Sequence, residues 1–153
     1  MRVWGRSWRR WSISAMCCYK PDETSRLIYR PRRHRKWKGT GRNSFAWTDY
    51  RDLAVRAHIQ LGTPIILIWD NLNMHRTAGL RQLAADHDWL TVVQLPSYAP
   101  GLNPAEGVWA LLRRGPLANV ASADDEHLER TLRRGLSHIQ RHPELVRADS
   151  CSS

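Results

Sequence analysis

The stretch PIILIWDN (residues 64–71) decides the fold class of this chain. Its five consecutive apolar residues, Ile65 to Trp69, are typical of a strand buried on both faces. Such a strand lies in the middle of a sheet that helices cover. The strand runs directly into Asp70, and ligands of open α/β sheets gather beyond the carboxyl ends of the strands. This position suits a functional acid, but Asp70 taken alone is better explained as capping a turn together with Asn71.

The segments around this strand predict an α/β chain with the order β-β-α-β-α-β-α-α. Periodicity, caps and turn residues place the elements. They are hairpin strands at 11–19 and 26–30, a loop at 30–43, a helix from Thr48 to Gly62, a short helix around Leu80, a strand at 89–95, a helix from Asn103 to about Arg114, and a last helix from Ser122 to before Pro143. The last helix carries a predicted buried stripe of Leu128, Leu132, Leu136 and Ile139.

The positive charge is concentrated at the N-terminal end. The chain has 153 residues and a net charge of +10, and residues 1–43 hold 13 Lys and Arg against two acids. Such a block most often binds a polyanion, and nucleic acid is the commonest one. A solvated arm is the alternative. The candidate nucleic-acid-binding residues are Arg30, Arg32, Arg33, Arg35, Lys36, Lys38 and Arg42.

The stretch LPSYAPGLNPAEGVW (residues 95–109) ends in a second candidate acid, Glu106. Asn103 is a good N-cap, Pro104 suits the first helical position, and Glu106 falls at the third, so a capping box explains these residues without any function. However, Asp70 lies 36 residues earlier, separated by one helix and one strand. The second strand then returns beside the first, and both carboxylates can reach one edge of the sheet. Phosphoryl transfer through Mg²⁺ needs such hard oxygen ligands.

Two motifs resemble a known family. The segments WDNLNMHR (69–76) and LPSYAPGLNPAEGVW resemble the second and third motifs of mariner-like bacterial insertion-sequence transposases, which are DDE superfamily endonucleases with an RNase H-like fold. The resemblance implies that Asp70 and Glu106 are catalytic carboxylates and ligands of Mg²⁺ (or Mn²⁺). Asn71 and His75 match the same motif. The resemblance gives His75 either a contact with the scissile phosphate or a structural hydrogen bond at a helix start.

The resemblance also implies a first catalytic Asp on a strand upstream of the hairpin, and this chain has no match for it. Asp22 and Glu23 fall in the hairpin turn, while Asp49 and Asp52 fall on the following helix. We therefore expect an incomplete RNase H-like domain without its first strand, inactive alone, that holds one metal ion weakly or not at all. The expected organisation is a disordered basic remnant at 1–10, a truncated catalytic domain at 11–148 and a tail at 149–153.

The expected partner is DNA, and a homodimer is one arrangement open to the chain. No apolar run approaches the length of a membrane span, and Cys17, Cys18 and Cys151 have no disulfide-like spacing, so we expect a cytoplasmic, nucleoid-associated protein without a membrane or small-molecule cofactor. One rival function is a non-catalytic nucleic-acid-binding remnant that uses the basic third. Another is an unrelated hydrolase built on Asp70 and His75, against which the lack of a Ser or Cys nucleophile in a strand-turn-helix context counts.

Overall fold

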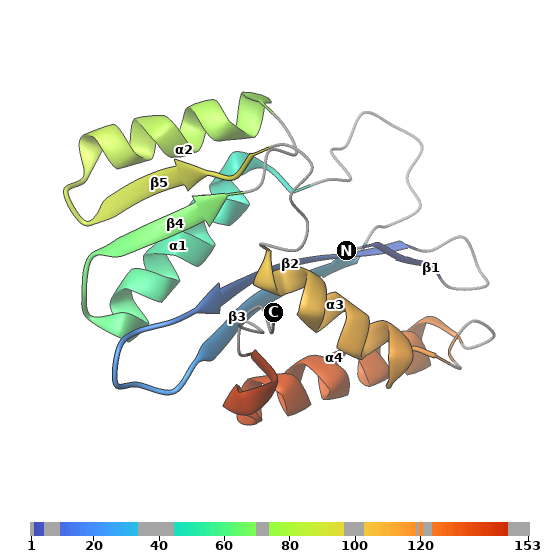
Figure 1. Ribbon diagram of the computed structural model, residues 1–153. Helices are drawn as coiled ribbons and strands as arrows, with labels where there is room; N and C mark the ends of the chain where they lie inside the picture. The colour runs from blue at the N-terminus through green and yellow to red at the C-terminus, as the bar shows by residue number, and fades with distance from the viewer. Residues whose placement is uncertain are drawn as a thin grey trace. The chain divides into compact units, whose positions relative to one another are not determined.

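The computed structural model describes residues 2–4, 10–33, 45–69, 74–96, 103–118, 120 and 124–146. The chain divides into two compact units (Figure 1). The first unit comprises Met1–Asn43 and Pro104–Ser153, and the second comprises Ser44–Asn103. Strands and helices occur in both units, so the mixed α/β architecture predicted from the sequence is confirmed.

The first unit contains a three-stranded antiparallel sheet of β1 (Arg2–Trp4), β2 (Arg10–Cys18) and β3 (Arg26–Arg33), in the order β1-β2-β3. Strands β2 and β3 form the predicted hairpin, paired from Trp11 opposite Arg33 to Cys18 opposite Arg26. Strand β1 lies within the segment expected to be a disordered remnant, and it pairs with the start of β2.

Strand β3 is longer than predicted. Residues 31–33 belong to the strand, although the sequence predicted a loop from residue 30 onward. Pairing with β2 explains the difference, because β2 begins as early as Arg10 and offers a partner up to Arg33. Pro31 lies in β3, an edge strand among the described strands of this sheet, which is the kind of strand in which proline is tolerated.

The core of the first unit forms where two helices, α3 (Pro104–Arg114) and α4 (Asp125–Arg141), pack against the hairpin. The predicted stripe of α4 is buried as expected, with Leu132 and Leu136 fully buried. Trp11, Ile13 and Leu27 contribute from the sheet. The side chain of Gln140 donates to the carbonyl of Leu27 at 2.9 Å, which fixes α4 on β3.

Two polar contacts complete the first unit. The 3-10 helix η2 (Pro143–Val146) follows α4, and Tyr19 Oη donates to the carbonyl oxygen of Val146, which holds the hairpin to the C-terminal end of this unit.

Helix α4 begins later than predicted. Its N-cap is Asp124, whose side chain accepts from His127 N at 2.7 Å, so the prediction of a start at Ser122 was wrong. A carboxylate is as good an N-cap as a hydroxyl, and the sequence offers both within three residues.

The second unit has the order α1 (Trp47–Leu61), β4 (Ile65–Trp69), α2 (Met74–Asp86) and β5 (Leu90–Gln94). Strands β4 and β5 pair in parallel, as a crossover through a helix requires. Helix α1 ends at Gly62, as predicted, because this residue adopts φ 64°, the left-handed conformation that ends helices and that glycine adopts without strain.

The prediction that β4 is buried on both faces was wrong. Leu67 and Leu90 are buried, whereas Ile66 and Ile68 are 71% and 60% exposed. Helices α1 and α2 contact each other, α1 contacts β4 and α2 contacts β5, so they cover the same face of the sheet. An apolar run does not reveal how many faces are covered, because burial depends on tertiary neighbours. No helix in the described residues is long and apolar enough to cross a membrane.

Candidate active site

Glu106 lies in the first turn of α3, as predicted, because Pro104 opens the helix. Its side chain is 50% exposed, while Val108, Trp109 and Leu112 form the buried side of the same helix. Arg113 of the same helix is a described neighbour, and its Nη2 lies 3.8 Å from Glu106 Oε2. This distance is at the long end for an ion pair, and an exposed pair of this kind is weak. The carboxylate of Glu106 is therefore accessible to a cation from solvent.

The strand that leads to Asp70, β4, is fixed by ring and hydrogen-bond contacts up to its last residue, Trp69. The ring of Trp69 meets that of Tyr50 edge to face at 4.7 Å, and its carbonyl oxygen accepts from Leu95 N at 2.8 Å. Asp70 and Asn71 lie outside the described residues. His75 belongs to the first turn of α2, the helix-start position that the sequence predicted. The proximity of Asp70 to Glu106 stays a prediction, since the two residues belong to different units.

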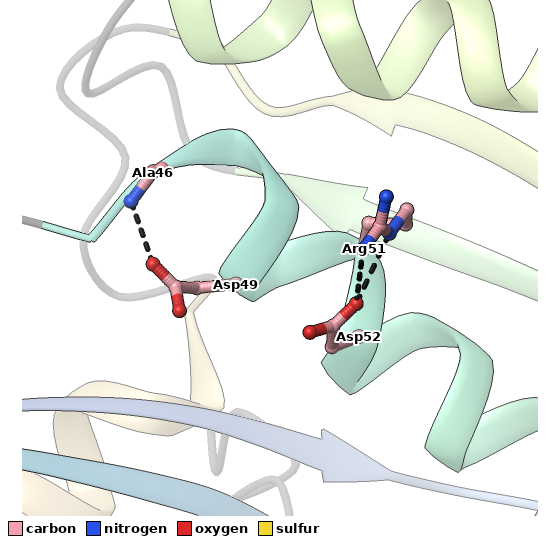
Figure 2. A network of polar contacts seen from close by, with 4 residues as sticks. All are labelled: Ala46, Asp49, Arg51 and Asp52. Atoms are coloured by element: carbon pink, nitrogen blue, oxygen red, sulfur yellow. Dashed lines mark hydrogen bonds and ion pairs between the residues drawn. The ribbon is translucent and has the colours of Figure 1, made fainter.

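The acids of α1 have local partners (Figure 2). Asp49 is buried, and its Oδ2 accepts from the backbone N of Ala46 at 2.8 Å, which caps the start of the helix. Asp52 accepts from the neighbouring Arg51 at 2.8 Å on the surface. Each of these contacts lies within the helix or next to its start, and whether another acid replaces a catalytic Asp stays a prediction.

One acid of the hairpin turn, Glu23, has ion-pair partners close by in sequence. Asp22 adopts φ 61° in the turn, and Glu23 pairs with Lys20 and with Arg26, the latter at 3.0 Å. The hydrogen bond from Lys20, with a smaller contribution from Arg26, holds the pKa of Glu23 below its usual value. Among the described residues, no three or more His, Cys, Asp or Glu side chains gather into a metal-binding group. The described part of the chain therefore offers Glu106 as a single accessible donor at the predicted site.

The predicted nucleic-acid-binding residues fall partly on β3. Arg30, Arg32 and Arg33 belong to this strand, and Arg30 and Arg33 are exposed. The other four candidates, Arg35, Lys36, Lys38 and Arg42, lie outside the described residues.

Sequence reasoning missed a second basic surface, on α4. A hollow of about 550 Å³ is lined by one face of this helix, which we call the α4 arginine face. It consists of Arg130, Arg133, Arg134, Ser137, His138 and Arg141. The signal was present in the sequence, because these residues recur at helical spacing opposite the leucine stripe. The net charge of residues 44–153 did not reveal this surface, because acids elsewhere in that range offset the charge of the arginines.

Burial makes the thiols of the hairpin unreactive. Cys17 and Cys18 are free, and desolvation raises the pKa of each to about 11. A thiol with such a pKa is protonated at neutral pH and is a poor nucleophile. These cysteines are therefore part of the packing of the hairpin, and they do not extend the candidate site.

The described residues form a mixed α/β fold with an exposed acid, Glu106, in the first turn of α3. The chain belongs to the DDE superfamily endonucleases, whose family model matches residues 5–129. The match spans both motifs and includes Asp70 and Glu106. Members of this family act on DNA, and DDE enzymes typically use divalent metal ions. No curated protein and no solved structure matches the chain.

Proposed function

We propose that this chain is part of the catalytic domain of a mariner-like insertion-sequence transposase, descended from an enzyme that cuts and joins DNA strands through Mg²⁺ or Mn²⁺. One observation carries the proposal. The family match covers both acidic motifs, and Glu106 is an accessible carboxylate in the first turn of α3. In this proposal Asp70 and Glu106 are the two carboxylates of the site, and Asn71 and His75 support it.

The chemistry of the donors fits a hard divalent cation. Carboxylate oxygens are the ligands that Mg²⁺ prefers, and the partner of Glu106 among the described residues is Arg113, which is 3.8 Å away and easily displaced by a metal. A bound ion would polarise the scissile phosphate and activate the attacking hydroxyl. Titration of the full chain with Mn²⁺, followed by electron paramagnetic resonance, tests this. Weak binding that both Asp70→Asn and Glu106→Gln reduce supports joint ligation, whereas unchanged binding in both variants contradicts it.

We further propose that the 153-residue chain does not cut DNA by itself. The support is the placement of the acids nearest in sequence to the missing position, because Glu23, Asp49 and Asp52 each hold a local contact. The test is the conversion of supercoiled plasmid to open circles with Mg²⁺ or Mn²⁺. Nicking by the chain alone, lost in Glu106→Gln, would contradict the proposal.

A repaired chain gives the complementary test. A segment from another family member that supplies one more strand with an acidic residue would be joined ahead of β2. Metal-dependent nicking should then appear, and Asp70→Asn or Glu106→Gln should abolish it. Glu106→Gln is the sharper variant, because glutamine still serves a capping box but is a poor metal ligand. If the repaired Glu106→Gln chain still nicks DNA, Glu106 is a helix cap and not a ligand.

The second candidate function is a non-catalytic DNA-binding protein that uses the basic N-terminal third. The exposure of Arg30 and Arg33 on β3 favours it. Replacing Arg32, Arg33, Arg35, Lys36 and Lys38 with Ala should then remove most of the binding to duplex DNA. Metal-dependent nicking by the repaired chain separates the two candidates, since a pure binding protein would show none.

A further inference from the structure

The α4 arginine face is a basic surface that the N-terminal charge block does not include. Its side chains lie on the side of α4 opposite Leu128, Leu132 and Leu136, which are buried in the core of the first unit. The surface therefore faces away from the core. Arg130 and Arg133 are 63% and 58% exposed. Among the residues that the structure describes in the first unit, none packs on this half of the helix in a way that would account for four arginines.

The charge along α4 is segregated. The helix contains no acid between Arg130 and Arg141, because its acids all precede Arg130. Two of these acids form ion pairs with arginines of the α4 arginine face. Glu126 lies 3.9 Å from Arg130, and Glu129 lies 2.9 Å from Arg133. Such exposed pairs between residues four apart are weak in water, so the guanidinium groups can exchange them for a more strongly charged anion.

The spacing of the arginines suits a row of phosphates. Arg130 and Arg141 are eleven residues apart, about 16 Å along a helix axis. Over that length duplex DNA presents several phosphates on one side. The planar guanidinium donates two parallel hydrogen bonds to a phosphate, and this geometry explains the value of arginine over lysine at such a surface. Ser137 adds a hydroxyl in the middle of the row.

We propose that the α4 arginine face binds the phosphate backbone of duplex DNA without reading its sequence. The choice of DNA as the partner rests on the proposed function. The surface is distinct from Arg30 and Arg32 of β3. Leu27 and Tyr29 of that strand pack into the core that α4 covers, so Arg30 and Arg32, which alternate with them, point to the other face of the sheet. Each surface can therefore be removed without touching the other.

The test is fluorescence anisotropy of a labelled duplex of arbitrary sequence, titrated with the full chain at several KCl concentrations. The test variant carries Arg130→Gln, Arg134→Gln and Arg141→Gln. We expect at least a tenfold loss of affinity at low salt, and a plot of log K against log[KCl] that is less steep by about 2 to 3, as the loss of as many phosphate contacts requires. Far-UV circular dichroism checks that α4 remains folded.

Two control variants separate local contacts from total charge. Arg51→Gln, Arg56→Gln and Arg81→Gln together remove the same charge from the second unit, and should change the affinity by less than about twofold because these residues are not part of the α4 arginine face. Changing Arg130, Arg134 and Arg141 to Lys keeps the charge at α4, and should retain most of the binding even if the Gln variant is poorly folded.

The outcomes distinguish the surface from the proposed function. If the parent binds DNA and the Gln variant binds as tightly with the same salt dependence, the α4 proposal is overturned and the proposed function stands. If the parent binds no duplex DNA, both are overturned. Loss of binding to vesicles that contain phosphatidylserine, with unchanged binding to DNA, would show that the surface recognises a membrane and would also overturn the proposal.

Discussion

The two units of this protein bury their apolar residues to different degrees. In the first unit, Leu112, Leu132 and Leu136 are fully buried between two helices and a hairpin. In the second unit, helices cover one face of the β4-β5 sheet, and the other face leaves Ile66 and Ile68 largely exposed. A helix can bury its apolar stripe against one neighbour, whereas a sheet needs a neighbour on each of its two faces. The predicted site takes one acid from each unit, so it depends on both.

The largest effect should come from the core of the first unit. Leu132→Ala leaves a cavity at a fully buried position and should lower the free energy of unfolding by about 2–5 kcal/mol. Ile68→Ala, on the open face of the second unit, should cost less than about 1 kcal/mol because the side chain is 60% exposed. Urea unfolding followed by circular dichroism measures both. Equal losses would mean that the two units do not differ in packing.

A glycine pair tests how closely the helices of the first unit approach. A Cβ at Gly135 of α4 would lie 2.8 Å from Leu112 Cδ2 and 3.0 Å from Pro116 Cγ. Gly135→Ala should therefore destabilise the protein by about 1–3 kcal/mol despite the better helix propensity of alanine. Gly107→Ala in α3 meets nothing within 4 Å and should stabilise it by about 0.5–1 kcal/mol. Thermal melts of the two variants should shift in opposite directions.

The N-cap of α4 should have a smaller effect. Asp124→Ala removes the acceptor for His127 N and should cost about 1 kcal/mol, while Asp124→Asn should keep most of the stability because asparagine caps equally well. Both variants can be compared by urea unfolding. A loss in Asp124→Asn as large as in Asp124→Ala would assign the effect to charge and not to the cap.

The smallest effect concerns the turn of the hairpin, and it depends on pH. The pKa of Glu23 is lowered in the folded protein, so its ionised form contributes stability above its unfolded-state pKa, and this contribution is lost as the pH falls through the folded-state pKa. Glu23→Gln should slightly lower the melting temperature at neutral pH, and the difference should disappear in acid. A difference that persists in acid would show that the side chain acts through packing.

Local signals were read correctly from the sequence. Gly62 and Pro104 set helix boundaries through their own backbone preferences, and the leucine stripe of α4 follows from its spacing. The errors concern neighbours that are distant in sequence. The open face of β4 and the extension of β3 to Arg33 depend on what pairs or packs with these strands. At the candidate site, the position of Glu106 could be predicted from the local Asn-Pro signal, whereas its distance to Asp70 involves two separate units. The α4 arginine face was missed because charge was summed along the chain and not around the helix.

The exposed face of the β4-β5 sheet has a consequence for the association of the protein with other chains. Ile66, Ile68 and Val93 form an exposed apolar surface on a sheet of only two strands, each of which has one neighbour among the described strands. Exposed apolar strands with unpaired edges are templates for association with other chains, and quality control acts on molecules that display them. The expected consequence is association of this chain with itself or with other chains when it is concentrated.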